Sequence, residues 1–166
     1  MALTTILIRQ EDLTSNTIIG GSVDVDRYLQ AIKACQNIYI KPLLGDSLYN
    51  KICNDFENST LTGLYLELYD SFVKELTIHG SAEIYLSQGA YMVSNSGITK
   101  TKTDTSETIS KEEIDYLVEA SRKLYRLYEN EFLKWIKNNN IVEYNKPDTV
   151  KHRQYGGWYI RKKGNC

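Results

Sequence analysis

Apolar residues recur at helical spacing along most of the chain. The first such stretch predicts a helix that begins near Ser22 or Asp24, since either side chain can accept hydrogen bonds from the free N–H groups of a first turn. Pro42 cannot donate a backbone hydrogen bond and disfavours a helical residue before it, so we expect a break there. Beyond the break, apolar residues at every fourth position predict a second, shorter helix. The two apolar faces comprise Val25, Leu29, Ile32, Cys35 or Gln36, and Tyr39, and then Leu44, Leu48, Ile52 and Phe56.

The middle of the chain repeats the helical pattern after a polar interruption. Residues 58–60, Asn-Ser-Thr, are typical of a turn. From Leu61 to about Val93 the pattern fits either one long bent helix or two consecutive helices. Gly80 and Gly89 lie inside this run, and each costs roughly 1 kcal/mol relative to alanine. We therefore expect a bend near one of them.

The last helix has the clearest signature. Ser110 and Glu113 form a capping box, in which the hydroxyl caps the helix start and the carboxylate reaches back. Asn138-Asn139-Asn140 is expected to end the helix. Its wide apolar stripe comprises Ile114, Leu117, Val118, Leu124, Tyr125, Tyr128, Phe132, Trp135 and Ile136.

The remaining segments lack a helical pattern. Residues 1–21 predict an extended arm or short strand that ends at Gly20-Gly21. Residues 94–110 form a polar region in which threonine alternates with charge from Thr99 to Thr105, and this fits either a solvated polar loop or a two-stranded hairpin near 98–109. The sequence thus predicts an all-α protein, a small bundle of three to five helices. Its parts are an N-terminal arm (1–21), a helical domain (22–140) and an extended basic and aromatic C-terminal tail (141–166).

Composition sets broad limits on class and compartment. A chain of 166 residues, 42% of them hydrophobic, can bury a core without disulfides or a metal. We find no signal-peptide pattern at the start and no run of about 18 apolar residues, so we expect no membrane association. The three cysteines are widely spaced, which favours reduced thiols and a reducing cytoplasm as the place of synthesis or assembly.

Charge is unevenly distributed, and this points to the tail. Residues 1–150 carry 15 Lys and Arg against 21 Asp and Glu, whereas residues 151–166 carry five basic residues and no acidic one. The overall charge of −1 excludes a protein that coats nucleic acid with its whole surface. The tail's aromatic and basic residues can stack on bases and hold phosphates, or anchor in a groove of a protein partner with an acidic rim, and a disordered terminus is the third reading. We favour docking, by Tyr155, Trp158, Tyr159, Arg161, Lys162 and Lys163.

Catalytic chemistry is not indicated. The sequence lacks a phosphate-binding GxxxxGK[ST] loop, GxGxxG, HExxH and GxSxG. His79 lies on an apolar helical face, which favours a core or subunit-contact residue, and His152 lies in the basic tail. The scattered Cys and His residues do not match a zinc site. We expect no enzyme, no cofactor and no metal.

Tyrosine is abundant, with 13 residues against three Phe and two Trp. Tyrosine is enriched at protein–protein interfaces, because it combines a large apolar area with a polar tip. The predicted helices hold more tyrosines than one small core is expected to hide. Contacts between subunits and ordinary packing with a compositional bias remain equal explanations.

A short motif adds a family resemblance. The segment Tyr39-Ile-Lys-Pro42-Leu43-Leu44-Gly45-Asp-Ser-Leu-Tyr49 resembles the helix–helix corner of small head–tail connector (adaptor) proteins of tailed bacteriophages, and the layout agrees over roughly residues 24–140. The resemblance implies a helical structural protein of the virion neck that assembles in the host cytoplasm. It would form a ring, commonly twelve-fold, that docks beneath the portal protein, extends the DNA channel and provides the platform for the next neck or tail protein.

The resemblance also suggests roles for particular segments. Residues 98–109, with Lys100, Lys102 and Asp104, would project toward the lumen or the next ring, and the tail would reach the portal or an adjacent subunit. The mildly acidic body would let double-stranded DNA pass without sticking. The alternative function is a small helical regulator whose tail binds nucleic acid, and an electrophoretic shift assay with DNA distinguishes the two.

Overall fold

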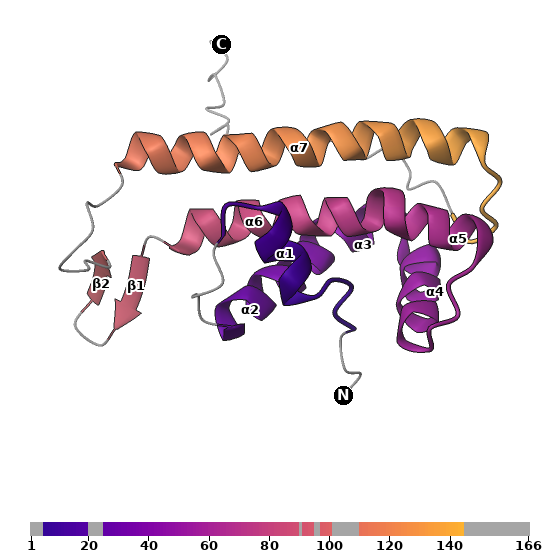
Figure 1. Cartoon of the computed structure of the whole chain (residues 1–166), viewed down its shortest axis with the longest axis horizontal. Helices are drawn as coiled ribbons and strands as arrows, with labels where there is room; N and C mark the ends of the chain where they lie inside the picture. Colours follow the sequence, from indigo (N-terminus) through magenta and orange to yellow (C-terminus); the bar gives the residue numbers. More distant parts are fainter. Residues whose placement is uncertain (1–4, 20–24, 90, 95–96, 101–109, 145–166) are drawn as a thin grey trace, which may run out of the picture.

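The computed structural model describes residues 5–19, 25–89, 91–94, 97–100 and 110–144. The predicted all-α class is confirmed, and a small β-hairpin is added to it (Figure 1). Two five-residue π-helical turns, η1 and η2, interrupt the helices. The elements are α1 (Gln10–Asn16), α2 (Val25–Cys35), η1 (Gln36–Ile40), α3 (Lys41–Leu44), α4 (Asp46–Glu57), α5 (Gly63–Leu68), η2 (Tyr69–Val73), α6 (Lys74–Gly89), β1 (Tyr91–Ser94), β2 (Gly97–Lys100) and α7 (Lys111–Asn138).

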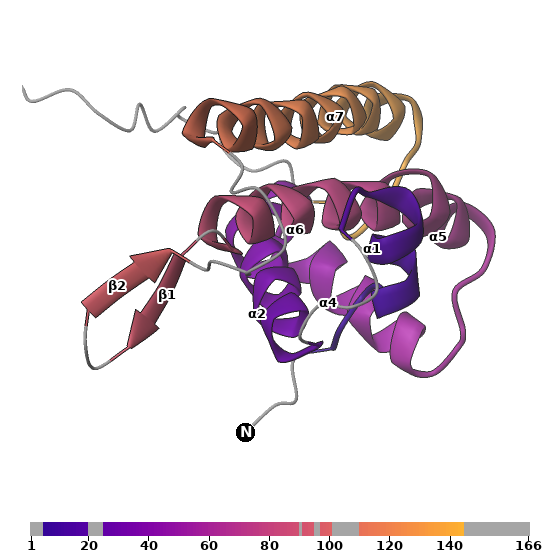
Figure 2. The same ribbon diagram turned by 60° about the vertical axis from the view of Figure 1, so that its left-hand side comes forward.

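Helix α6 forms the centre of the molecule. The long helix α7 runs along one side of it, and α1, α2 and α4 lie on the other side (Figures 1 and 2). The main core includes the fully buried side chains of Leu48, Leu76 and Phe132. A smaller core, which includes Leu13 and Tyr28, lies where α1 and α2 meet α6.

The expected break at Pro42 is wrong, because the helical backbone continues through this residue to Leu44. In η1 the N–H of Lys41 donates to the carbonyl of Gln36, five residues back. Pro42 then lies in the first turn of α3, where a missing N–H is tolerated. The chain turns instead at Gly45, whose φ of 79° lies in the left-handed region that favours glycine.

The second helical region is also irregular at an unexpected place. The irregularity is η2, between α5 and α6, whereas Gly80 lies inside α6 and Gly89 is its last residue. Residues up to Val93 do not continue the helix, because Tyr91–Ser94 pairs antiparallel with Gly97–Lys100. A hairpin is therefore present, but it begins earlier than residues 98–109; residues 101–109, with Lys102 and Asp104, lie outside the described residues. Figure 2 shows the hairpin projecting away from the helices.

Residues 5–19, which we call the N-terminal strap, differ from the predicted extended arm. Residues 10–16 form α1, where the backbone N–H of Arg9 donates to the Asp12 carboxylate at 2.8 Å. Asp12 also pairs with Lys74 of α6 at 2.7 Å, and the strap residues Leu7 and Leu13 are fully buried. The strap is thus packed on the body because its apolar residues complete the core.

The predicted features of the last helix are confirmed at both ends. The Ser110 N–H donates to Glu113 Oε2 at 2.7 Å, and the Glu113 N–H donates to Ser110 Oγ at 3.2 Å. Helix α7 ends at Asn138. Residues 141–144 then form a turn rather than the start of an extended tail, because Ile141 is buried and Tyr144 contacts Phe132 at a ring distance of 5.9 Å.

Most described tyrosines pack within this one chain. The side chains of Tyr28, Tyr49, Tyr69 and Tyr125 are buried, and others are half-buried. The core thus hides only some of the helical tyrosines, and aromatic pairs such as Tyr39 and Tyr125, 5.2 Å apart, share the interior. Contacts between subunits through the half-buried rings stay a prediction. In the described helices the large exception is Tyr116, which is 73% exposed.

The buried tyrosines predict a loss of stability at alkaline pH. Burial raises the pKa of Tyr49 to about 12, and it raises the pKa of Tyr69 and Tyr125 as well. In the unfolded chain these phenols ionise near their ordinary pKa of about 10. The free energy of unfolding should therefore hold up to about pH 10 and decrease as the pH rises further. Urea unfolding at pH 8 to 11 measures this, with tyrosinate absorbance as the second signal.

The control for that series is Tyr125→Phe, which removes one of the buried phenols. Its free energy of unfolding should decrease less steeply above pH 10 than that of the wild type. Equal slopes for the two proteins, or ionisation of the buried phenols without unfolding at pH 10, would contradict the assignment.

Candidate subunit interface

The six residues of the corner motif divide into two groups, one at the turn between α3 and α4 and one at the surface. Leu44, Gly45 and Tyr49 hold the corner itself, and the side chains of Leu44 and Tyr49 are buried. The Gly45 N–H donates to the carbonyl of Lys41, and the Gly45 carbonyl accepts from the Tyr49 N–H, each at 3.0 Å. Tyr39, Pro42 and Leu43 instead line a groove at the surface.

A buried amide connects the corner to the N-terminal strap. The Nε2 of Gln36 donates to Tyr49 Oη at 2.9 Å and to the Thr5 carbonyl at 2.7 Å, while its Oε1 accepts from the Leu7 N–H at 3.0 Å. Tyr69 donates its hydroxyl to the Leu7 carbonyl at 2.6 Å. Gln36 and Tyr69 are the first residues of η1 and η2. Both π-helical turns therefore fasten the strap.

The surface groove, which we call the corner groove, lies between η1–α3 and α7. Its volume is about 290 Å³. Ile38, which is 58% exposed, extends its apolar wall. The full lining is Ile38, Tyr39, Pro42, Leu43, Glu83, Arg122, Tyr125, Arg126 and Glu129.

An ion-pair cluster fixes the α6–α7 side of this groove. Arg122 contacts the buried Glu83 at 2.9 Å and Glu119 at 2.8 Å. The hydrogen bond to Glu83 raises the pKa of the Arg122 guanidinium, so this group is charged at all ordinary pH values. Because Glu83 already has a cationic partner, the groove fits an apolar side chain of a protein better than a cationic ligand.

A second apolar surface lies on the opposite side of α7. Tyr116, Leu124 and Leu127 are 73%, 43% and 50% exposed, and we call them the outer flank. Leu124 belongs to the predicted apolar stripe, but it lies outside the buried face of α7, which centres on Tyr125, Phe132 and Ile136. Successive helical residues turn by about 100°, so the outer flank and the groove-lining residues of α7 face roughly opposite directions.

His79 and Cys35 are packed in the interior. His79 is buried, stacks on Tyr128 at a ring distance of 5.6 Å and lies 3.6 Å from Glu75. Burial lowers the pKa of His79, as expected for a core histidine. Burial raises the pKa of Cys35 to about 12, so its thiol is protonated at neutral pH. Within the described ranges, no three His, Cys, Asp or Glu residues form a group that could hold a metal ion.

Several predicted site residues cannot be placed in either surface. Tyr155, Trp158, Tyr159, Arg161, Lys162 and Lys163 lie outside the described residues, as does His152. Lys100 is the last residue of β2, and its backbone is opposite Tyr91. Sequence reasoning missed Gln36 as a polar anchor and Arg122 as a groove residue. The signal for Gln36 was a polar side chain on an otherwise apolar helical face.

Comparison with known proteins identifies a family. A family model described as "Family of unknown function (DUF6712)" matches residues 40–154, which is more than half of the chain. Neither a curated protein nor a solved structure matches the chain. The matched residues include the lining of the corner groove from Pro42 onward and the whole of α7. In the described part of the chain, no helix has the length and apolar character needed to cross a membrane.

Proposed function

The chain belongs to the DUF6712 family of unknown function, and we propose, from the resemblance of its corner motif and from the two surfaces described above, that it is a head–tail connector subunit of a tailed bacteriophage. Copies of the chain assemble into a ring in the virion neck, beneath the portal protein. The ring extends the DNA channel and provides the platform for the next neck or tail protein. The protein acts by assembly, and no catalytic step is proposed.

The observation that carries this proposal is the pair of apolar surfaces on opposite sides of α7. A ring requires heterologous contacts, in which one surface of each copy meets a different surface of the next. The corner groove, with Ile38 at its edge, and the outer flank, which includes Leu127, are two such surfaces. Repeating the contact places each copy between two neighbours.

Two further features support the proposal. Three of the groove residues, Tyr39, Pro42 and Leu43, belong to the motif that resembles phage connectors. The hairpin of β1 and β2 projects from the end of α6, away from the helices (Figure 2). A projecting hairpin on each copy would form a ring of contacts toward the channel or the next layer.

The proposal predicts that Leu127→Glu abolishes ring assembly. The leucine is 50% exposed, so the monomer should fold normally, whereas a carboxylate buried against the corner groove would carry a desolvation penalty. Co-expression with the portal protein encoded in the same genome, followed by native mass spectrometry, measures the number of copies bound. The wild type should bind as a ring of about twelve copies and the variant at most singly.

The matched control is Val142→Glu, because Val142 is 81% exposed and lies on neither surface. It should assemble like the wild type. Ile38→Glu blocks the other surface, so a mixture of Ile38→Glu and Leu127→Glu chains should give pairs and no ring. Full rings from Leu127→Glu, or failure of Val142→Glu, would refute the proposed contact.

A further inference from the structure

A second groove lies beside the N-terminal strap, and we call it the strap groove. The strap, the end of α4 and the region of α5 and η2 enclose a volume of about 390 Å³. Leu66, on the outward side of α5, is 41% exposed and forms its edge. The lining residues are Ile6, Arg9, Phe56, Ser59, Leu61, Leu66 and Tyr69.

The segment that forms most of this groove is acidic. Residues 52–73 contain Asp55, Glu57, Glu67 and Asp70 and no lysine or arginine. Glu57 accepts a hydrogen bond from the Thr5 hydroxyl, next to the groove residue Ile6. Asp70 follows Leu66 by four residues along the helical backbone, so the two share a face.

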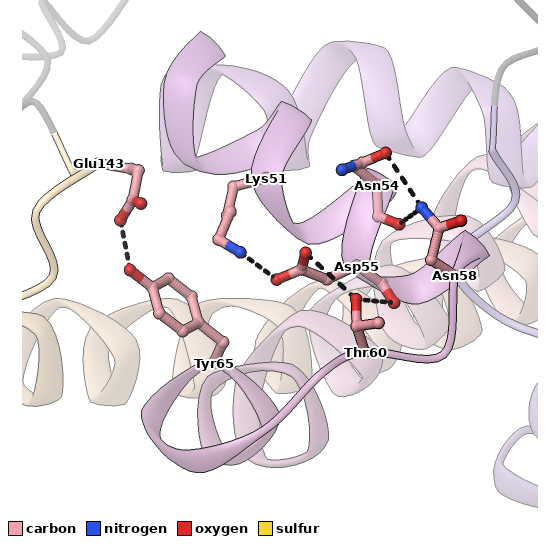
Figure 3. Close-up of polar contacts among 7 residues, drawn as sticks. All are labelled: Lys51, Asn54, Asp55, Asn58, Thr60, Tyr65 and Glu143. Atoms are coloured by element: carbon pink, nitrogen blue, oxygen red, sulfur yellow. Dashed lines mark hydrogen bonds and ion pairs between the residues drawn. The ribbon is translucent and has the colours of Figure 1, made fainter.

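The described chain ends close to this groove. The Tyr65 hydroxyl donates to Glu143, so the residues after α7 are held against α5 (Figure 3). The Lys51 ammonium, which pairs with Asp55 at 2.6 Å, also lies 5.1 Å from the centre of the Tyr65 ring. Leu66 follows Tyr65 on the same short helix, whose diameter is about 10–12 Å. The last described residues, Glu143 and Tyr144, therefore lie against the short helix that carries the groove residue Leu66.

We propose that residues 155–163 of the C-terminal tail dock in the strap groove of their own chain, with Trp158 as the apolar anchor. The tail after residue 150 carries five basic residues and no acidic one, which complements the acidic segment 52–73. Arg161, Lys162 and Lys163 meet its carboxylates, and Arg9 offers a guanidinium on which an aromatic ring can stack.

The reach and the connectivity favour docking within one chain. Trp158 follows Tyr144 by 14 positions, and an extended chain of that length spans up to about 46–50 Å. Tethering beside the groove gives the segment a high effective concentration, so its own groove is preferred over that of another molecule. Residues 1–4, which adjoin the strap through Thr5, are the competing occupant within this chain, but they carry no basic side chain.

The test follows Trp158 fluorescence in the full-length chain with Trp135→Phe, so that one tryptophan remains. In this single-tryptophan chain, acrylamide should quench the Trp158 fluorescence only weakly. The added substitution Leu66→Glu should increase this quenching about threefold, because the indole leaves a desolvated pocket. Raising the salt concentration from 0.05 to 0.5 M should also increase quenching, since the flanking charge pairs are screened. Unfolding curves verify that each variant is folded.

Leu64→Glu is the control, because Leu64 is equally exposed at 41%, lies on the same helix and does not line the groove. It should leave quenching unchanged. The proposal is overturned if Trp158 is fully accessible before the groove is changed, if the two glutamate variants behave alike, or if quenching depends on protein concentration, which would indicate the tail of a second copy. Because the measurement needs no ring, it does not depend on the connector proposal.

Discussion

Gly80→Ala should lower the free energy of unfolding by about 1–3 kcal/mol, the usual cost of overpacking a core, although alanine is the better helix former. A Cβ atom at this position would lie 2.6 Å from Cys35 Sγ, 3.2 Å from Tyr39 Cδ2 and 3.3 Å from Tyr125 Cδ2. The gain in helix propensity is about 1 kcal/mol, so the clash must exceed it for the protein to lose stability. Urea unfolding at neutral pH measures the difference.

The sulfur atom cannot move aside at low cost. The Cys35 side chain is fully buried, and its thiol lies 3.9 Å from the Leu76 carbonyl and 3.7 Å from the Thr77 carbonyl. Either the side chain leaves this position or α2 moves away from α6. The second response would also shift Tyr39 and Tyr125, which are the opposing walls of the corner groove.

The matched control is the same substitution in a Cys35→Ala background. Without the sulfur, the added methyl group fills space and improves helix propensity, so Gly80→Ala should become neutral or stabilising there. An equal loss of stability in both backgrounds would show that the clash with Cys35 is not the cause. If Gly80→Ala stabilises the otherwise wild-type protein, α6 can readily move away from α2 and α7.

Local rules explain why parts of the fold were predictable. Helix α7 has its capping box, its apolar stripe and its terminal asparagines within one continuous segment, and the structure has the helix where these signals place it. Helix α4 likewise follows from apolar residues at every fourth position. The strap was misjudged because α1 has only seven residues, which is too short for a periodic pattern to show.

Other features were missed because they depend on the hydrogen-bond pattern of the neighbouring turn or on contacts between distant residues. Pro42 suggested a break because its effect was judged from its neighbours, whereas η1 changes the hydrogen-bond pattern just before it. The corner groove was only half visible, since Tyr39, Pro42 and Leu43 come from the motif but Arg122 meets Glu83 across 39 positions. The tyrosine excess left interfaces and internal packing as equal explanations, and the structure shows rings of α2, η1 and α6 that pack against α7 and against one another.

Gln36→Leu should detach the N-terminal strap and cost about 2–4 kcal/mol of stability, because several buried polar groups lose their partners at once. Leucine has a similar volume but no polar atoms, so the Leu7 N–H, the Thr5 carbonyl and Tyr49 Oη lose the bonds that Gln36 supplies. Hydrogen exchange at the Leu7 amide reports the detachment directly, and urea unfolding gives its cost. Exchange at the Leu7 amide should accelerate at least tenfold, which corresponds to about 1.4 kcal/mol.

Tyr49→Phe separates the strap from the rest of this network. It removes one acceptor from Gln36 but leaves the bonds to Thr5 and Leu7, so it should cost about 1 kcal/mol without faster exchange at Leu7. If Gln36→Leu leaves Leu7 exchange unchanged, Tyr69 alone holds the strap, and the role given to the amide is wrong. Gln36→Leu also affects the strap groove, because Ile6 and Arg9 line this groove on the strap side. Detachment should therefore expose Trp158 to acrylamide as Leu66→Glu does, while Tyr49→Phe should not.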